Sequence, residues 1–369
     1  MTIQLSDHFT YKRLLRFTLP SMAMMIFTSI YGVVDGIFVS NYAGKTAFAA
    51  LNLIMPYLMA TSVIGFMIGT GGTALISMTL GMGDKKRANE LFSLLTYVSI
   101  IGGIILTVIS VIFMRPAAVL LGASGQMLED AVIYGNITQI ALTAYVLQFA
   151  FQSFCITAEK PNLSLIMMVT AGVCNIVLDA LFVAVFHWGL VGAAVATAAA
   201  QIIGAMIPLV YFMRPNDSLL RLGRCHMDWK ALLHTCTNGS SELMSNLSMS
   251  LVSMLYNLQL IKYAGENGIA AYGVIMYVNF VFIAVFIGFV IGSAPIIGYH
   301  YGADNRQELK NMFRKSLVII GFFCRCNGWR SIFDGRTPGG NFCWLRSGFD
   351  GNDGPGLLDL LPVVPAVRV

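Results

Sequence analysis

Charged side chains are scarce in this chain of 369 residues, where Asp, Glu, Lys and Arg together make up only 11%. Soluble proteins carry about 25% charged residues, so the composition excludes an ordinary water-soluble domain. Hydrophobic residues reach 57%, and the mean hydropathy is +0.73. These values indicate a protein that lies in a lipid bilayer.

Chemical motifs are also scarce, which narrows the function. The five His residues are scattered, and neither His-Glu-x-x-His nor Gly-x-Ser-x-Gly occurs. The loops at 81–87 and 302–306 lack the Walker pattern, so no ATP site is indicated. Seven Cys residues show no metal-ligand spacing beyond one Cys-x-Cys. We therefore expect no enzyme, no metal and no cofactor, and the net charge of +5 implies no nucleic-acid role.

Long uncharged stretches recur along the chain, each exceeding the roughly 20 residues that cross a membrane as a helix. The longest holds two helices, because His187-Trp188-Gly189 predicts a turn. The sequence therefore predicts an all-α polytopic membrane protein with eight spans up to about residue 300. Four windows carry no charge (46–83, 91–114, 131–158 and 267–303), and three carry one acid each (17–44 with Asp35, 161–213 with Asp179 and 231–261 with Glu242).

An internal repeat relates the two halves of the chain. Shifting the numbering by 221 superposes residues 14–95 on 235–316 without a gap. Tyr42-Ala43-Gly44 then pairs with Tyr263-Ala264-Gly265, and Gly81 pairs with Gly302. A parallel repeat of apolar helices is typical of transporters in which two similar bundles rock about a central site.

The basic residues are distributed unequally between alternate loops. If the N-terminus is placed inside, fifteen Lys and Arg residues fall on the inner side, whereas the outer side receives only Lys45, Arg115 and Lys262. By the positive-inside rule this predicts a multi-pass protein of the cell membrane, in contact with lipid, with a cytoplasmic N-terminus.

Acidic residues inside the spans are the first candidates for function, because a carboxylate in hydrocarbon is costly. Asp35 and Asp179 both lie toward the outer end of outward-running spans. Asn175 precedes Asp179 by one helical turn, and Thr197 reaches a similar depth on the returning span. These four side chains could share a pocket in which burial and mutual repulsion favour proton uptake. Alternatively, they are hydrogen-bonding contacts between helices.

Glu242 is harder to assign. It lies early in the window at 231–261. It is either a functional carboxylate or a solvated acid at the start of its helix, where free backbone N–H groups favour negative charge.

Several segments resemble the multidrug and toxic compound extrusion (MATE) family of transporters. Residues 31–44, Tyr-Gly-Val-Val-Asp-Gly-Ile-Phe-Val-Ser-Asn-Tyr-Ala-Gly, resemble the first helix of the family. Glu159-Lys160-Pro161 and the segment at 175–179 are similar to its fourth loop and fifth helix, and 189–197 to the start of its sixth. The residues at 257–260 and 271–275 are most similar to those of the MepA-like branch of the family.

The resemblance implies a carrier of two six-helix bundles that exports amphipathic, cationic drugs in exchange for protons or sodium by alternating access. Position by position, Asp35, Asn175, Asp179 and Thr197 would form the cation-coupling pocket of the first bundle. Aromatic and methionine side chains would bind substrate, because Met adapts to varied ligands and aromatic faces attract cations. The substrate-binding candidates are Tyr31, Met55, Tyr145, Glu242, Tyr256 and Tyr277, with Met24 beside them.

Two further readings remain open. A related fold flips lipid-linked oligosaccharides, although such a carrier would favour a more basic cavity. The second is a non-functional truncated transporter.

Two glycine motifs predict close helix packing, of the kind that a sliding interface needs. They are Gly65-x-x-x-Gly69 and Gly288-x-x-x-Gly292.

The composition changes after residue 323. From Cys324 onward the chain has five Arg but no Lys or Met, and it contains four Pro and eight Gly. We expect a frameshifted tail at 324–369, with a genuine extra cytoplasmic tail as the alternative. The predicted organisation is then a six-helix bundle at 1–213, a cytoplasmic loop at 214–234 and an incomplete second bundle at 235–323.

Overall fold

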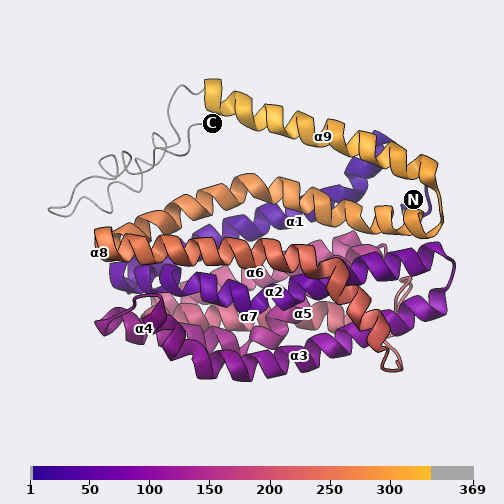
Figure 1. Ribbon diagram of the computed structural model, residues 1–369. Coiled ribbons are helices and arrows are strands. Elements are labelled where there is room, and N and C mark those ends of the chain that lie inside the picture. Colours follow the sequence, from indigo (N-terminus) through magenta and orange to yellow (C-terminus); the bar gives the residue numbers. More distant parts are fainter. Residues whose placement is uncertain (1–2, 334–369) are drawn as a thin grey trace. The chain divides into compact units, whose positions relative to one another are not determined.

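The computed structural model describes residues 3–333, apart from the side chains at 45, 266–267, 270–271, 274, 277–279, 281–282 and 323–333. Residues up to Met312 belong to one compact unit. All regular elements in the described range are helical, as the sequence predicts (Figure 1). The helix that begins at Arg306 continues to Phe333, and residues 334–369 of the expected tail lie outside the described residues.

The helices follow the apolar windows of the sequence, and the turn predicted at 187–189 separates two of them. Two helices end in a π-helical turn, labelled η. The elements are α1 (Tyr11–Phe38), η1 (Val39–Ala43), α2 (Lys45–Gly81), α3 (Lys85–Leu120), α4 (Gly125–Ile140), α5 (Leu142–Thr157), α6 (Pro161–Asp179), η2 (Ala180–Val185), α7 (Gly189–Met213), α8 (Trp229–Gly302) and α9 (Arg306–Phe333).

The number of membrane-crossing helices differs slightly from the expected eight. Six described helices are long and apolar enough to cross a membrane. The window at 131–158 is not one straight span, because α4 and α5 meet at an angle of 57° and make a seventh only if counted together. The window at 231–261 does form a helix, the first part of α8. Its nine Ser and Asn residues lower its hydropathy, and it is not among the six helices apolar enough to cross a membrane.

The internal repeat is visible in the helix boundaries. Gly44 separates α1 from α2 with a φ of 94°, and its repeat equivalent Gly265 interrupts α8 with a φ of 61°. Both angles lie in the left-handed region that glycine adopts without strain. Gly81 ends α2, and its equivalent Gly302 ends α8. Each half of the repeat is therefore a pair of helices with the same break and the same end.

The turn that follows each pair is also repeated. Asp84 accepts a hydrogen bond from the Arg87 backbone N–H (2.9 Å) at the start of α3. Its equivalent Asn305 accepts one from the Glu308 N–H (3.1 Å) at the start of α9. A side-chain oxygen at this position satisfies one of the free N–H groups of a helix start. Arg87 and Glu308 thus occupy the same position in the two copies.

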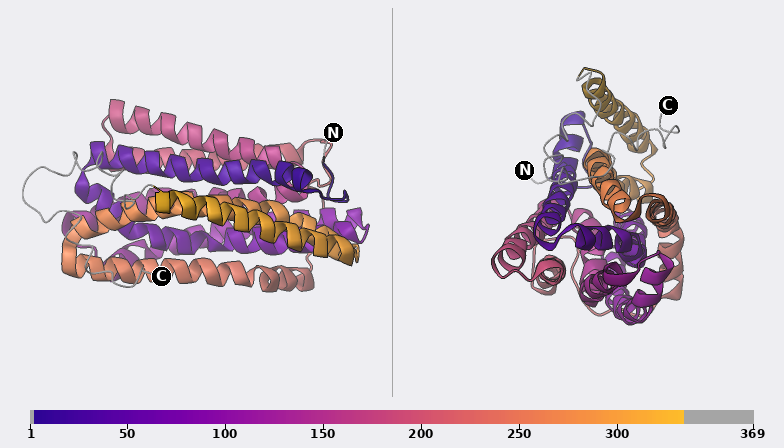
Figure 2. Two further views of the ribbon diagram at one scale, coloured as in Figure 1. Left: turned by 90° about the horizontal axis from the view of Figure 1, so that it is seen from above. Right: turned by 90° about the vertical axis from the view of Figure 1, so that its left-hand side faces the viewer.

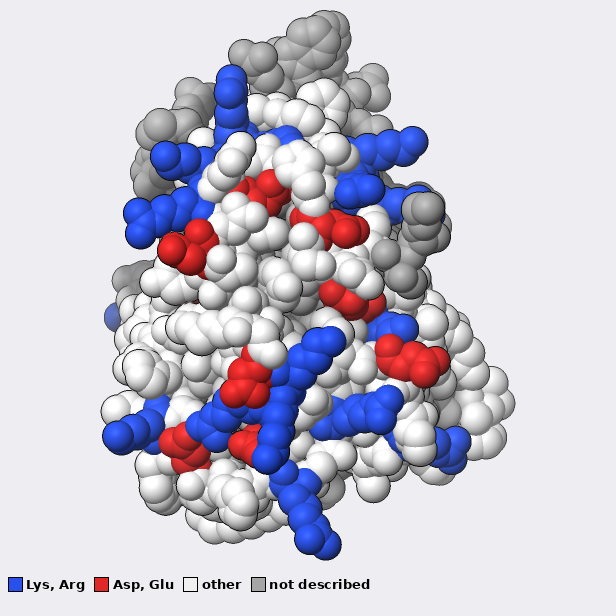
Figure 3. Space-filling model, turned by 90° about the vertical axis from the view of Figure 1, so that its right-hand side faces the viewer, with Lys and Arg blue, Asp and Glu red and all other residues white. Residues whose placement is uncertain are grey.

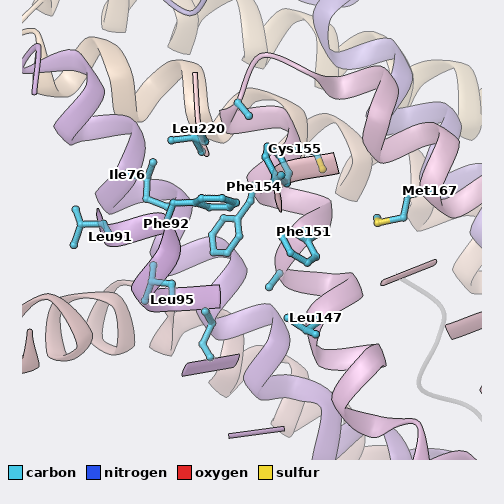
Figure 4. Close-up of a cluster of buried hydrophobic side chains, with 14 of the residues drawn as sticks. Ile76, Leu91, Phe92, Leu95, Leu147, Phe151, Phe154, Cys155, Met167 and Leu220 are labelled. Carbon is cyan, nitrogen blue, oxygen red and sulfur yellow. The ribbon is translucent and has the colours of Figure 1, made fainter. Parts of the chain in front are cut away.

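A cluster of aromatic side chains forms part of the core of the first half (Figure 4). Phe92 of α3 lies with its ring centroid 5.6 Å from that of Phe154 and 4.9 Å from that of Phe212. Phe151 stacks on Phe212 at 6.0 Å. Leu220, from the segment between α7 and α8, is fully buried in the same cluster. That segment is therefore anchored on the first half.

Replacing Phe92 by alanine is expected to lower the free energy of unfolding by about 3 kcal/mol, because it leaves a cavity in a closely packed aromatic cluster. Phe113→Ala on the same helix is the matched control, because its side chain is 57% exposed. Unfolding in lipid bicelles measures both. Equal losses in the two variants would contradict the assignment of this cluster to the core.

The two halves contact each other chiefly where α8 packs against α2 and against α1 (Figure 2). An added Cβ at Gly288 of α8 would lie 2.5 Å from the Cα of Met22, and one at Gly292 would lie 3.1 Å from the Cα of Thr18. The Gly65-x-x-x-Gly69 pair packs instead within the first half, against α5. Both motifs allow the close approach of helices that the sequence predicts.

Charged side chains gather at one end of the compact unit (Figure 3). We call this end the charged end. It includes the segment before α1, the turns after α2 and before α9, the loop between α5 and α6 and the segment between α7 and α8. Its residues are 3–10, 82–88, 158–160, 214–230 and 303–311.

Candidate coupling site

Two buried carboxyl groups meet between α1 and α6. Asp35 lies one turn before the end of α1 and is 6% exposed, and Asp179 is the last residue of α6 and is fully buried. Their carboxyl groups face each other closely enough to interact directly. The structure therefore brings together two acids that are 144 positions apart in the sequence.

The other two predicted residues adjoin this pair. Asn175 lies one turn before Asp179 on the same helix and is 2% exposed. Its Nδ2 donates a hydrogen bond to Thr197 Oγ1 of α7 at 3.4 Å. The bond links α6 to α7 and orients the amide. This arrangement agrees with a shared polar pocket. It agrees equally with the alternative that Asn175 and Thr197 only form a hydrogen bond between two helices.

The oxygen atoms of this cluster have few donors. Asp35 Oδ1, Asn175 Oδ1 and both carboxylate oxygens of Asp179 are buried without a hydrogen-bond partner among the described residues. A buried polar oxygen without a partner costs free energy, and two adjacent carboxylates add mutual repulsion. The cluster is therefore suited to a proton or a small cation, either of which would neutralise the charge.

A π-helical turn follows each aspartate. Residues Val39–Ala43 form η1 four residues after Asp35, and Ala180–Val185 form η2 directly after Asp179. The two turns contact each other. Single π-helical turns are rare and often occur at functional sites, because they interrupt the regular hydrogen bonding of the helix. The sequence gives no signal for them, since neither segment contains Pro or Gly.

Two aromatic candidates lie close to the acidic pair. Tyr31 is one turn before Asp35 and near enough to its carboxyl group to interact electrostatically. An added Cβ at Gly172 of α6 would lie 2.5 Å from the Phe27 ring and 2.9 Å from the Tyr31 ring, so this glycine makes room for both rings. Tyr145 of α5 adjoins Tyr31 and packs on Phe149 with ring centroids 4.5 Å apart.

The remaining candidates lie elsewhere. Met24 is fully buried, where its Sδ accepts a hydrogen bond from Ser164 Oγ (3.1 Å), and Met55 packs against a second hydrophobic cluster. Glu242 is half-buried on α8. Its assignment as a helix-start acid is wrong, because α8 begins at Trp229 and Asp228 caps it. The Tyr277 side chain lies outside the described residues.

Tyr256 occupies the repeat position of Asp35, since the two numbers differ by 221. Its ring is 51% exposed and stacks on Tyr272 with centroids 5.5 Å apart. The acidic residue of the first half is thus replaced by an aromatic one in the second. The two halves therefore share a backbone pattern but not the chemistry of this position.

Comparisons with known proteins agree with this architecture. The model of the family described as MatE matches residues 20–181 and 243–325. The multidrug export protein MepA of Staphylococcus haemolyticus is 27% identical over 311 residues, covering 84% of this chain and 68% of MepA. MepA of Staphylococcus saprophyticus is 25% identical over 318 residues, covering 86% and 70%.

Solved structures give the same result. The MATE multidrug transporter DinF-BH, solved in complex with rhodamine 6G, superposes with a TM-score of 0.81 at 25% identity, covering 87% of this chain and 73% of that one. An outward-facing multidrug resistance transporter of the MATE family superposes with a TM-score of 0.80 at 22% identity, covering 89% and 73%, and shares the fold.

Proposed function

Because the chain belongs to the MatE family, a family of membrane transporters rather than enzymes, we propose that it exports amphipathic cationic compounds in exchange for a cation. The names of the relatives support export of drugs, and the rhodamine bound to DinF-BH supports a dye as substrate. The two halves, 1–213 and 235–323, would rock about their interface, joined by the loop at 214–234.

The buried carboxyl pair of Asp35 and Asp179 is the observation that carries this proposal. A pair without donors is costly when both groups are charged. Uptake of a proton or sodium ion from the outside removes that cost, and release to the inside restores it. Coupling requires such a site, whose occupancy is linked to the direction in which the carrier opens. Asn175 and Thr197 would orient the pair.

The predicted orientation follows from the charged end. Its loops carry ten Lys and Arg residues, whereas the opposite end carries Lys45, Arg115 and Lys262, so the positive-inside rule assigns this end to the cytoplasm and the carboxyl pair to the outer half of the membrane. The N-terminus is then cytoplasmic, and the cell membrane is the location. An external cation would reach the pair without crossing the whole bilayer.

Substrate would be held by aromatic side chains. Tyr31 lies beside the acidic pair and Tyr145 adjoins Tyr31, and a cation over an aromatic ring gains about 0.5–2 kcal/mol. A drug cation held there would be attracted by the carboxylates. Protonation would weaken that attraction, so that cation uptake and drug release occur together. Further contacts with the substrate are proposed for Met55, Glu242, Tyr256 and Tyr277.

Dye uptake into everted membrane vesicles tests this function. Cells that lack other exporters would produce the full chain, with vector-only vesicles as the control. We expect accumulation of the rhodamine dye when a proton or sodium gradient is imposed, and its collapse when that gradient is dissipated. ATP alone, with both gradients abolished, is expected to give no accumulation. Uptake equal to the vector control under both gradients would contradict the proposal.

A further inference from the structure

The segment before α1 is fixed between the two halves at the charged end. The Leu5 backbone N–H donates a hydrogen bond to Glu159 Oε1 (2.6 Å), in the loop between α5 and α6. The Phe9 N–H donates to Glu308 Oε1 (2.9 Å), in the first turn of α9. Leu5 and Phe9 are both fully buried. Residues 3–9 therefore bond to the first half through one acid and to the second half through another.

Glu308 is the centre of the second attachment. Its Oε2 lies 2.6 Å from His8 Nδ1, and Asn311 Nδ2 donates both to Glu308 Oε1 (2.8 Å) and to the Phe9 carbonyl (3.2 Å). Burial of the carboxyl group raises its pKa, but the bonds from Phe9, Asn311 and His8 outweigh this, so the pKa lies below its ordinary value. Glu308 is thus charged at neutral pH.

A second contact joins the halves at the same end. The Arg87 guanidinium, in the first turn of α3, forms an ion pair with Asp228, the residue that caps α8. Asp228 also accepts hydrogen bonds from the backbone N–H groups of Ala231 (3.1 Å) and Lys230 (3.0 Å). These bonds and Arg87 hold the pKa of Asp228 below its ordinary value, so this carboxylate too is charged at neutral pH.

The internal repeat relates the two contacts. Arg87 and Glu308 are equivalent, and Asp228 is equivalent to Asp7, the neighbour of His8. Arg87, the third residue of α3, binds the segment that leads into α8. Glu308, the third residue of α9, binds the segment that leads into α1. The geometry is repeated although the charges are reversed. Two interactions at symmetric positions, with different chemistry, indicate that the position itself has a role.

The ends of α2 and α8, which lie beside these contacts, pack directly against each other. An added Cβ at Gly81 would overlap the Tyr299 carbonyl oxygen, and one at Gly302 would overlap that of Met78. Met78 and Tyr299 are themselves repeat equivalents. The ends of α2 and α8 therefore meet in a reciprocal contact. A polar cavity of about 440 Å³, lined in part by Asp7, His8, His300 and Glu308, lies beside it.

We propose that Arg87–Asp228 and Glu308–His8/Phe9 form a double clamp that holds the cytoplasmic side of the carrier closed and must open when that side opens. This inference rests on the proposed alternating-access function. A rocking motion separates the ends of α2 and α8, and both clamps join the halves across that separation. Residues 3–9, bonded to Glu159 as well, act as a strap over the closed interface.

Hydrogen exchange of the full chain in lipid nanodiscs tests the clamp without relying on transport. The variant Arg87→Gln/Glu308→Gln removes one charge from each clamp. We expect exchange in 74–84 and 296–305 to rise by about fivefold, while 147–155 in the core stays unchanged. The matched control is Arg115→Gln/Glu129→Gln, which removes an ion pair of 2.7 Å at the opposite end and is expected to change neither region.

Two results would overturn the clamp. One is unchanged exchange at 74–84 and 296–305. The other is an equal rise at 147–155, which indicates general loss of stability. If the double variant does not fold, Arg87→Gln alone is expected to show the fast exchange, and Arg87→Lys, which keeps the charge, to exchange slowly. Equally fast exchange in Arg87→Lys would also overturn the clamp. Absence of transport, by contrast, would refute the proposed function and leave this result standing.

Discussion

Dye efflux is expected to fall by at least about tenfold when Asp179 is replaced by asparagine, because the amide keeps the shape of the side chain but cannot bind and release a proton or balance a cation. Asp179 is fully buried, and neither of its carboxylate oxygens has a partner among the described residues. The substitution therefore removes a buried, costly charge while it keeps the size of the side chain. Efflux of a fluorescent dye from energised cells measures the effect.

The melting temperature of Asp179→Asn distinguishes a role of Asp179 in coupling from a purely structural role. If Asp179 only joined helices, asparagine would destabilise the protein. We expect instead an unchanged or higher melting temperature, since a buried unpaired charge is lost. Asp35→Asn is expected to behave in the same way, and the double variant to be no worse than either single one, because the two groups act as one site. Full additivity of the two losses would contradict a shared site.

Asp130→Asn is the matched control for this series. Its carboxylate lies on α4 and accepts an exposed hydrogen bond from Gln126 (2.9 Å). It undergoes the same chemical change but lies on α4 and not at the α1–α6 contact. Normal efflux is expected for this variant. Normal efflux in Asp179→Asn as well would remove the carboxyl pair from the mechanism.

Replacing Gly81 or Gly302 by valine is expected to reduce efflux by at least about tenfold. The new side chain overlaps a backbone carbonyl of the opposite half, Tyr299 for Gly81 and Met78 for Gly302. A backbone atom cannot rotate away as a side chain can, so the helix ends must separate, and overpacking of this kind costs about 1–3 kcal/mol. The cytoplasmic side would then fail to close.

Gly102→Val on α3 is the control for these glycines, because nothing lies within 4 Å of an added Cβ there. Dye efflux is measured for all three variants at equal amounts of protein in the membrane. A monodisperse chromatogram in detergent shows that each variant is folded. Wild-type efflux by folded Gly81→Val and Gly302→Val would mean that the reciprocal contact does not occur in the transport cycle.

Much of the fold can be predicted from the sequence, because charge and apolar length determine where a helix can lie in a membrane. The 221-residue repeat predicts the equivalent ends at Gly81 and Gly302, and the turn at 187–189 lies where predicted. The bend between α4 and α5 could not be predicted, since the residues around Ala141 include no Pro and carry no charge. Such a bend depends on tertiary packing.

The candidate site was predictable in part. Helix direction and depth suffice to group Asp35, Asn175, Asp179 and Thr197, which the structure brings together. The unpartnered oxygens and the two π-helical turns were not predictable, because both depend on how α1, α6 and α7 pack. The segment at 3–9 was missed for a similar reason. Its short polar sequence gives no sign that Leu5 and Phe9 are buried.

Ion flux in proteoliposomes tests the central claim, that the carboxyl pair couples cation entry to drug export. Purified protein would be reconstituted with the rhodamine dye, a pH-sensitive dye and a sodium-sensitive dye inside, and acid or sodium then added outside. The account predicts that the rhodamine leaves together with entry of protons or sodium, and that Asp179→Asn abolishes both fluxes. Rhodamine export without movement of either ion, or coupled flux retained in Asp179→Asn, would contradict it.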